Sequence, residues 1–283
     1  MKKIHIAPFV AFATVLSCQK TVVETEVIKE VVEVVVPNPD DPVRTQAVMP
    51  GFEEGHVNPT GTDGAAWLFD NATGIPDVYI KVEADEWNRL LAAFDKNSKT
   101  REAIHADLSV AKGDDACLVR DVALSIKGNT SRRRPEGAAG SKHILDGGDW
   151  HHCHFGISLD KYNSSNGIGA MKKLVLKWFK DDGNYVRELY SYDLFRRFGV
   201  WTGPEDVYVR VWLQVGKDLE PAYFGVYQMY EPYDRAYLDR RADRYGRSDG
   251  NLWACNYGAT LTPSTLLAEK SGATCSCSPT NPS

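Results

Sequence analysis

Apolar and polar residues alternate regularly along most of the chain from Trp67 onward, and the period of this alternation predicts the secondary structure. A period of two is typical of half-buried strands, because successive side chains point to opposite faces. This pattern predicts strands at residues 77–82, 105–110, 117–127, 153–160, 172–179, 206–215 and 222–231. The last two are close enough in the sequence to form a hairpin.

Apolar residues return at helical spacing in two other segments. Residues 84–95 and 184–198 each place several large apolar side chains on one face, which predicts two amphipathic helices. Gly199 is well placed to end the second helix. Pro232 can open a last short helix.

In the middle of the chain the predicted order is strand, glycine turn, two strands, helix and two strands. This order is similar to that of the small lobe of a protein kinase. We therefore expect an α+β fold, in which an antiparallel sheet packs against one helix. The comparison rests on element order and concerns the fold alone, because one fold can carry many functions.

The first 18 residues differ from the rest of the chain. Two lysines precede an apolar run that ends at Leu16, and Ser17 and Cys18 follow. A basic start with a short apolar stretch is typical of a secretory signal peptide. The ending resembles a bacterial lipobox, which predicts an acylated Cys18 and an exported protein held by lipid in the cell envelope. Gln19 fits the outer membrane; a plain signal peptide with an incidental cysteine is the alternative.

Residues 19–65 separate this leader from the patterned part of the chain. Val and Glu alternate within residues 21–36, and residues 37–65 are rich in Pro, Gly, Asp and Thr. We interpret the whole segment as a stalk and linker. A short coiled or stacked β segment is the alternative for residues 21–36.

The composition limits the classes of function. Apolar residues make up 43% of the 283 residues and include 7 Trp and 13 Tyr, which is enough for a sizeable core. The net charge of -5 argues against a general nucleic-acid binder, because such proteins are normally basic. Of the six cysteines, five remain if Cys18 is lipidated, so at least one is unpaired. Cys275 and Cys277 are too closely spaced for an ordinary zinc site, and no metal site is predicted from cysteine.

Residues 128–134 read Gly-Asn-Thr-Ser-Arg-Arg-Arg and follow a predicted strand. Phosphates in proteins are held by amides of glycine turns, by hydroxyl groups and by cationic side chains. This composition predicts an anion site, with polyphosphate as its ligand. A solvated basic hairpin tip is the alternative, because the segment matches neither a Walker loop nor the glycine loop of ordinary kinases.

Two lysines on the strand at 172–179 share one face with a period of two. Lys177 is the preferred partner for a phosphate and for Glu188 on the following helix, and Lys173 is the second choice. Both lysines could instead be surface residues. Glu231 follows the last strand, where it could meet a nucleotide base, or it could favour the helix that begins at Pro232 through the helix dipole.

The stretch 151–154 reads His-His-Cys-His and raises the question of a metal site. On a strand, His152 and His154 share one face while His151 and Cys153 share the other, so the four cannot converge locally. We interpret these histidines as loop or strand-entry residues.

Residues 66–261 resemble the CotH kinase family. Four segments carry the resemblance: "IPDVYIKVEADEWNRLL", "IKGNTSR", "MKKLVLKWFKDDGNYVRELYSYDLFRRFGV", and "YFGVYQMYEPYDRAYLDRR" followed by "GNLWACNYGA". The resemblance implies an atypical secreted protein kinase that uses ATP and magnesium and phosphorylates Ser or Thr of an exported or surface protein. By position, it implies that Gly128, Asn129, Ser131 and Arg132 form the phosphate loop and that Lys177, Arg187 and Glu231 help to hold the nucleotide.

The sequence departs from the family pattern in two places. The usual basic pair before the second strand is replaced by "HHCHFGI", so one lysine is missing. The later motifs that supply the catalytic and metal-binding Asp are absent. Residues 262–283 also lack the aromatic, amphipathic pattern of the preceding residues. We expect a disordered or out-of-frame tail, an incomplete large lobe and impaired activity, because phosphoryl transfer needs such carboxylates. No catalytic residue is assigned.

Two other functions compete with the kinase. The chain could be a non-catalytic surface module that binds a protein partner or an anion. It could also bind carbohydrate through stacked aromatic side chains, although tryptophan at strand positions usually lies in the core. The candidates for stacking are Trp150, Trp178, Trp201, Trp212 and Trp253.

Overall fold

The computed structural model describes residues 44–60 and 65–246 and two short strand pairs outside them. It divides into two units, Met1–Thr45 and Gln46–Ser283. In the first unit, β1 (Lys3–Ile4) pairs antiparallel with β2 (Val34–Val35). The predicted lipobox, the stalk up to residue 43 apart from β2, and most of the tail lie outside the described residues.

The second unit is built mainly from strands. These are β3 (Asp77–Val82), β4 (Ala103–Lys112), β5 (Asp115–Lys127), β6 (His154–Ser158), β7 (Lys173–Lys177), β8 (Asp206–Val215), β9 (Ala222–Tyr230), β10 (Trp253–Ala254) and β11 (Ser278–Pro279). The helices are α1 (Ala65–Phe69), the 3-10 helix η1 (Asn71–Thr73), α2 (Ala84–Lys96), α3 (Arg187–Arg197), α4 (Arg235–Asp239) and α5 (Ala242–Tyr245). The strands and helices predicted from the hydrophobic pattern are present, with shifted ends.

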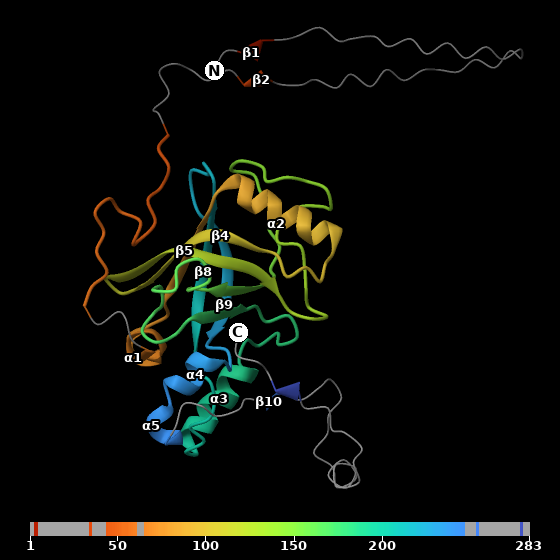
Figure 1. The fold of residues 1–283 in the computed structure, drawn as a ribbon. Coiled ribbons are helices and arrows are strands. Elements are labelled where there is room, and N and C mark those ends of the chain that lie inside the picture. Colours follow the sequence, from red (N-terminus) through yellow and green to blue (C-terminus); the bar gives the residue numbers. More distant parts are fainter. Residues whose placement is uncertain are drawn as a thin grey trace, which may run out of the picture. The chain divides into compact units, whose positions relative to one another are not determined.

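Strands β3 to β9 form a closed barrel in the order β3-β4-β5-β6-β7-β9-β8 (Figure 1). Neighbouring strands run antiparallel except β3 and β8, which pair in parallel and close the ring. β8 and β9 form the predicted hairpin. The pair β10 and β11 is antiparallel and separate from the barrel.

The expected α+β fold, resembling the small lobe of a protein kinase, is therefore wrong. The hydrophobic period identifies each strand, but it does not say which strands form hydrogen bonds with one another. The closing pair joins β3 to β8, where Arg210 also forms an ion pair with Asp77 from 133 positions away. Such non-local pairing leaves no local mark in the sequence.

Apolar side chains fill the barrel, and polar ones cover its outer face. On β7, Leu174 and Leu176 are buried, whereas Lys173, Val175 and Lys177 are half-buried on the opposite face. This confirms the predicted period of two on that strand. The inward residues of the seven strands belong to one hydrophobic cluster, whose burial stabilises the fold by about 25 cal/mol per Å².

Helix α2 lies over one end of the barrel, and α3, α4 and α5 lie at the other end (Figure 1). α2 buries Trp87, Leu90 and Leu91 in the core, as its helical spacing predicts. Asp85 and Glu86 in its first turn interact favourably with the positive end of the helix dipole. Within residues 44–60 and 65–246, no helix has the length and apolar character needed to cross a bilayer.

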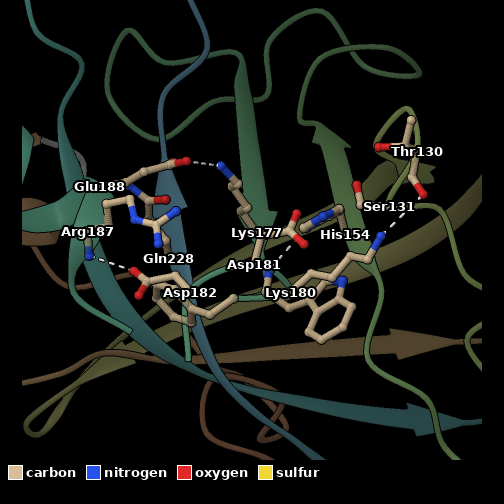
Figure 2. Close-up of a pocket in the computed structure, with 12 residues that line it drawn as sticks. Thr130, Ser131, His154, Lys177, Lys180, Asp181, Asp182, Arg187, Glu188 and Gln228 are labelled. Carbon is tan, nitrogen blue, oxygen red and sulfur yellow. Dashed lines mark hydrogen bonds and ion pairs between the residues drawn. The ribbon is translucent and has the colours of Figure 1, made fainter. Parts of the chain in front are cut away.

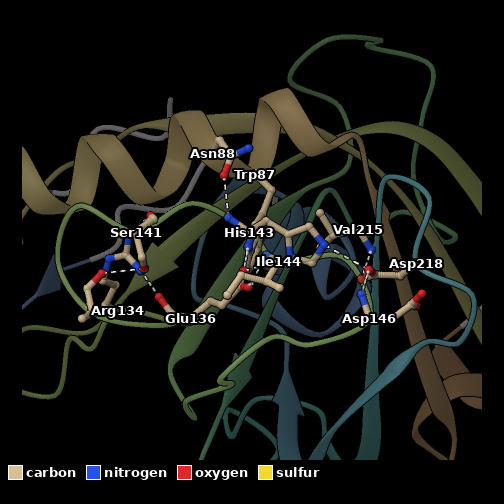
Figure 3. A network of polar contacts seen from close by, with 11 residues as sticks. Trp87, Asn88, Arg134, Glu136, Ser141, His143, Ile144, Asp146, Val215 and Asp218 are labelled. Carbon is tan, nitrogen blue, oxygen red and sulfur yellow. Dashed lines mark hydrogen bonds and ion pairs between the residues drawn. The ribbon is translucent and has the colours of Figure 1, made fainter. Parts of the chain in front are cut away.

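The long connection from β5 to β6 is fastened to the barrel by a buried polar network (Figure 3). His143 Nδ1 lies 3.1 Å from both carboxylate oxygens of Glu136, and its Nε2 lies 3.1 Å from Oδ1 of Asp218. Trp87 Nε1 donates to Glu136 at 2.7 Å. Because Asp218 lies between β8 and β9, the network joins the connection to the far side of the barrel and to α2.

Arg134 provides a second anchor for the same connection. Its guanidinium binds Asp95 of α2 through two contacts, Nε to Oδ1 at 2.8 Å and a terminal nitrogen to Oδ2 at 3.1 Å. It also donates to the backbone carbonyls of Glu136 and Ser141. Bidentate geometry of this kind is specific to arginine. All three guanidinium nitrogens of Arg134 therefore have partners that hold the β5–β6 connection in place.

Replacing His143 tests the importance of the network. We expect His143→Ala to lower the free energy of unfolding by about 3 kcal/mol, because Glu136 and Asp218 would stay buried without their shared partner. Urea unfolding monitored by tryptophan fluorescence measures this. As a control, Arg120→Ala removes an exposed ion pair with Asp107 and should cost less than about 1 kcal/mol. Equal losses in the two variants would contradict a special role of the buried network.

Candidate functional site

A cleft of about 220 Å³ opens where β6, β7 and the start of α3 meet the glycine loop after β5 (Figure 2). We call it the Lys177 cleft. Its lining includes the hydroxyls of Thr130 and Ser131, the ring of His154 and three cations and three carboxylates. The charged residues are Lys177, Lys180, Arg187, Asp181, Asp182 and Glu188.

Lys177 and Glu188 form an ion pair inside this cleft (Figure 2). Lys177 ends β7 on its outward face, and Glu188 stands in the first turn of α3, so the short connection between the two elements brings them together. The predicted pairing is thereby confirmed, whereas its role in nucleotide binding stays a prediction. The side chains keep 37% and 42% of their area exposed, which leaves both accessible to a ligand.

Asp182 holds the start of α3 in place beside this pair. Its Oδ2 accepts hydrogen bonds from the backbone amides of Val186 at 2.9 Å and Arg187 at 2.6 Å. These bonds lower the pKa of Asp182, because they favour the charged carboxylate. Arg187 is exposed and lines the cleft, whereas its role in holding a nucleotide stays a prediction.

The glycine loop brings its hydroxyls to the cleft. Gly128 has a φ of +102°, and a side-chain carbon there would lie 2.6 Å from Oγ of Ser131, so glycine is required at this turn. Lys180 Nζ donates to the carbonyl of Thr130 at 3.4 Å, which links the loop to the end of β7. Asn129 is exposed and is not among the described residues that line the cleft.

Arg132 turns away from the cleft and secures the loop instead. Its guanidinium donates to the backbone carbonyls of Gly128 at 2.8 Å, Thr100 at 2.6 Å and Ser98 at 3.2 Å. The latter two follow α2, so the arginine ties the loop to that end of the barrel. The structure therefore brings Ser131 and Lys177 together without bringing Arg132 to them.

Glu231 also lies outside the lining of the Lys177 cleft. Its carboxylate is buried, forms ion pairs with Arg240 and Arg241, and accepts the amide of Glu205 at 3.1 Å. These partners occupy both carboxylate oxygens. The helical segment after Pro232 thus uses Glu231 to dock against the barrel.

His154 begins β6, as predicted for a strand-entry residue, and it also lines the cleft, which was not predicted. Its Nδ1 accepts the backbone amide of Trp178 at 3.1 Å, so Nε2 carries the proton of the neutral ring. Burial first, and then the charge of Lys177, lowers the pKa of His154 to about 4. The ring is therefore neutral at physiological pH. The position of His154 at the cleft depends on the register of β5 and β6, which sets His154 opposite Lys127. The sequence alone does not give this register.

Two other sequence hypotheses concern the neighbouring histidines and the tryptophans. Cys153 is fully buried, and burial raises the pKa of its thiol, so it stays protonated and unsuited to metal binding. Among the described residues, no group of three His, Cys, Asp or Glu side chains is placed to hold a metal ion. Trp150 is half-buried and packs against Trp87 and Phe224 of the core, so part of its ring area is spent on packing.

Comparison with protein families identifies residues 148–279 as a match to the family described as CotH kinase protein. The matched region contains β6 to β9 and α3 to α5, and therefore Lys177 and Glu188. It begins after the Gly128 loop. A search of curated proteins found no match to the chain. The resemblance inferred from the sequence is confirmed over residues 148–279.

The lowered pKa of His154 predicts a pH dependence of stability. The unfolded ring takes up a proton near pH 6.5, whereas the folded ring does so only near pH 4. The free energy of unfolding therefore falls as pH drops from about 6.5 towards 4 and is unaffected by this residue above that window. Urea unfolding of the wild type and His154→Gln between pH 4.5 and 7.5 measures the difference. A difference that stays constant with pH would show that His154 does not titrate in this way.

Proposed function

Residues 148–279 carry the match to the CotH kinase family, and from this premise we propose that the protein binds ATP with its phosphates in the Lys177 cleft and phosphorylates an exported protein. The observation that carries the proposal is the Lys177–Glu188 ion pair, which lies in one cleft with the Thr130 and Ser131 hydroxyls.

The cleft supplies the donors that a phosphate chain needs. Lys177, held by Glu188, presents an ammonium group to the cleft, and Lys180 and Arg187 add two further cations. Ser131 and Thr130 contribute hydroxyl groups, which bind phosphate oxygens readily. The role of Glu188 is to hold the ammonium group in position, as a paired carboxylate does for a lysine in phosphoryl transfer.

The family implies magnesium together with ATP, but the carboxylates of the cleft do not fit a metal centre as they stand. Of its three carboxylates, Asp182 accepts hydrogen bonds from the amides of α3 and Glu188 pairs with Lys177, so among the described lining residues only Asp181 remains to face a metal ion. The absence of a three-ligand cluster among the described residues agrees with this. No step of the reaction is therefore assigned to a metal ion here.

The family resemblance supports a proposal for the acceptor, and the leader sequence supports one for the location. We assign Ser or Thr of an exported or surface protein as the acceptor, and a lipid-anchored position in the cell envelope through Cys18. The described residues of the cleft bind and orient the phosphates. No general base for the acceptor hydroxyl is assigned among them.

Thermal unfolding in the presence of ATP tests the phosphate site. We expect ATP to raise the midpoint of the wild-type protein, because a ligand that binds only the folded state stabilises it. Lys177→Ala should lose most of this shift, because it removes the cation at the centre of the cleft. Differential scanning fluorimetry over a range of ATP concentrations, with magnesium and with EDTA, provides the measurement.

The control for this experiment is Lys217→Ala, which removes an exposed lysine on the turn between β8 and β9. It should leave the ATP-dependent shift unchanged. An undiminished shift in Lys177→Ala would place the nucleotide elsewhere. No shift in the wild type would contradict ATP binding by this chain.

A further inference from the structure

A second hollow, of about 250 Å³, lies on the outer face of β5, β6 and β7. Its floor is made of small side chains from paired positions, with Ser125 opposite Gly156 and Ala123 opposite Ser158. Four cations line it: Arg101, Lys127, Lys161 and Lys173. We call it the basic groove.

The basic groove is next to the Lys177 cleft. β7 begins with Lys173 in the groove and ends with Lys177 in the cleft. Lys127 of the groove is the direct cross-strand partner of His154 in the cleft. A ligand in the groove would therefore lie beside the phosphates proposed for the cleft.

The two hollows differ in charge. The Lys177 cleft has three cations and three carboxylates, whereas the described residues lining the basic groove have four cations and no carboxylate. The pKa of Lys127 is lowered, first because its side chain is partly buried and then because Lys173, Arg132 and Arg101 repel its charge. An anion would relieve this repulsion, and a concave surface of one charge concentrates anions.

Gly156 gives Lys127 its position in the groove. A side-chain carbon at Gly156 would lie 2.3 Å from Cε, 2.7 Å from Cγ and 3.0 Å from Cδ of Lys127. The stem of the lysine thus lies flat across the glycine. Any larger residue at position 156 would push the ammonium group away from the floor.

We propose that the basic groove binds an acidic peptide segment of the protein that is phosphorylated at the neighbouring Lys177 cleft. The proposal rests on the proposed function, because it names the class of protein substrate. The four cations come from separate segments of the chain, before β4, at the end of β5, after β6 and at the start of β7. Carboxylates spaced along an extended peptide can pair with them one by one.

Fluorescence anisotropy with the full chain tests this binding. The probes are a fluorescein-labelled peptide of alternating Glu and Ser and a matched peptide with Gln in place of Glu. We expect the Glu peptide to bind, with an affinity that falls as salt rises, and the Gln peptide not to bind. Lys127→Gln should weaken binding about two- to fivefold, as expected for one exposed ion pair. Lys127→Gln combined with Lys161→Gln should weaken it further.

The control Lys217→Gln changes the net charge by the same amount outside the groove and should leave the affinity unchanged. Gly156→Ala should weaken binding while leaving Lys127 in the sequence, and circular dichroism confirms that the variant is folded. Equal weakening by Lys217→Gln and Lys127→Gln, or equal binding of the two peptides, would overturn the proposal.

Inorganic triphosphate distinguishes the groove from a phosphate site. If it displaces the Glu peptide at micromolar concentration and Lys127→Gln reduces triphosphate binding, the groove binds phosphate and the peptide proposal is wrong. All peptide titrations are done without nucleotide. Failure of ATP to bind would therefore contradict the proposed function without affecting the test of the groove.

Discussion

The parallel pairing of β3 with β8 closes the sheet and fixes which side chains face outward on every other strand. In a closed barrel a strand cannot shift its register without moving all of its neighbours, because every backbone edge is already paired. Burial of the apolar cluster inside the barrel fixes which residues of each strand point inward and which point outward. The outer face of β5, β6 and β7 therefore presents Lys127, His154 and Lys177 together as a consequence of closure.

The connection between β5 and β6 depends on polar contacts for its position. His143, Glu136 and Asp218 fasten its middle, and Arg134 fastens it to α2. Arg132 ties its beginning to the carbonyls after α2. With these contacts in place, the hydroxyl groups of the glycine loop remain at the Lys177 cleft. Guanidinium groups suit this task, because one of them can satisfy several carbonyl oxygens at once.

Two hollows of different charge share the resulting face. In the Lys177 cleft the cations and carboxylates are equal in number, and the carboxylates position other groups. Asp182 orients α3, and Glu188 orients Lys177. The unbalanced charge of the basic groove favours any anion that enters it. The neutral ring of His154, fixed by the amide of Trp178, lies at the border between them and adds a donor without adding charge. This division of roles underlies both proposals.

The sequence by itself determined the strands, the helices and the pairing of Lys177 with Glu188, because each depends on residues near one another in the chain. Period two and period 3.6 are local properties, and Lys177 and Glu188 lie only 11 positions apart, across the connection from β7 to α3. Only the tertiary structure decided that the strands close into a barrel, that Arg132 binds carbonyls, that Glu231 is buried against Arg240 and Arg241, and that His154 faces the cleft. Each of these depends on a partner or on a strand register set by packing, and a side chain with several possible partners takes the one that the fold places beside it.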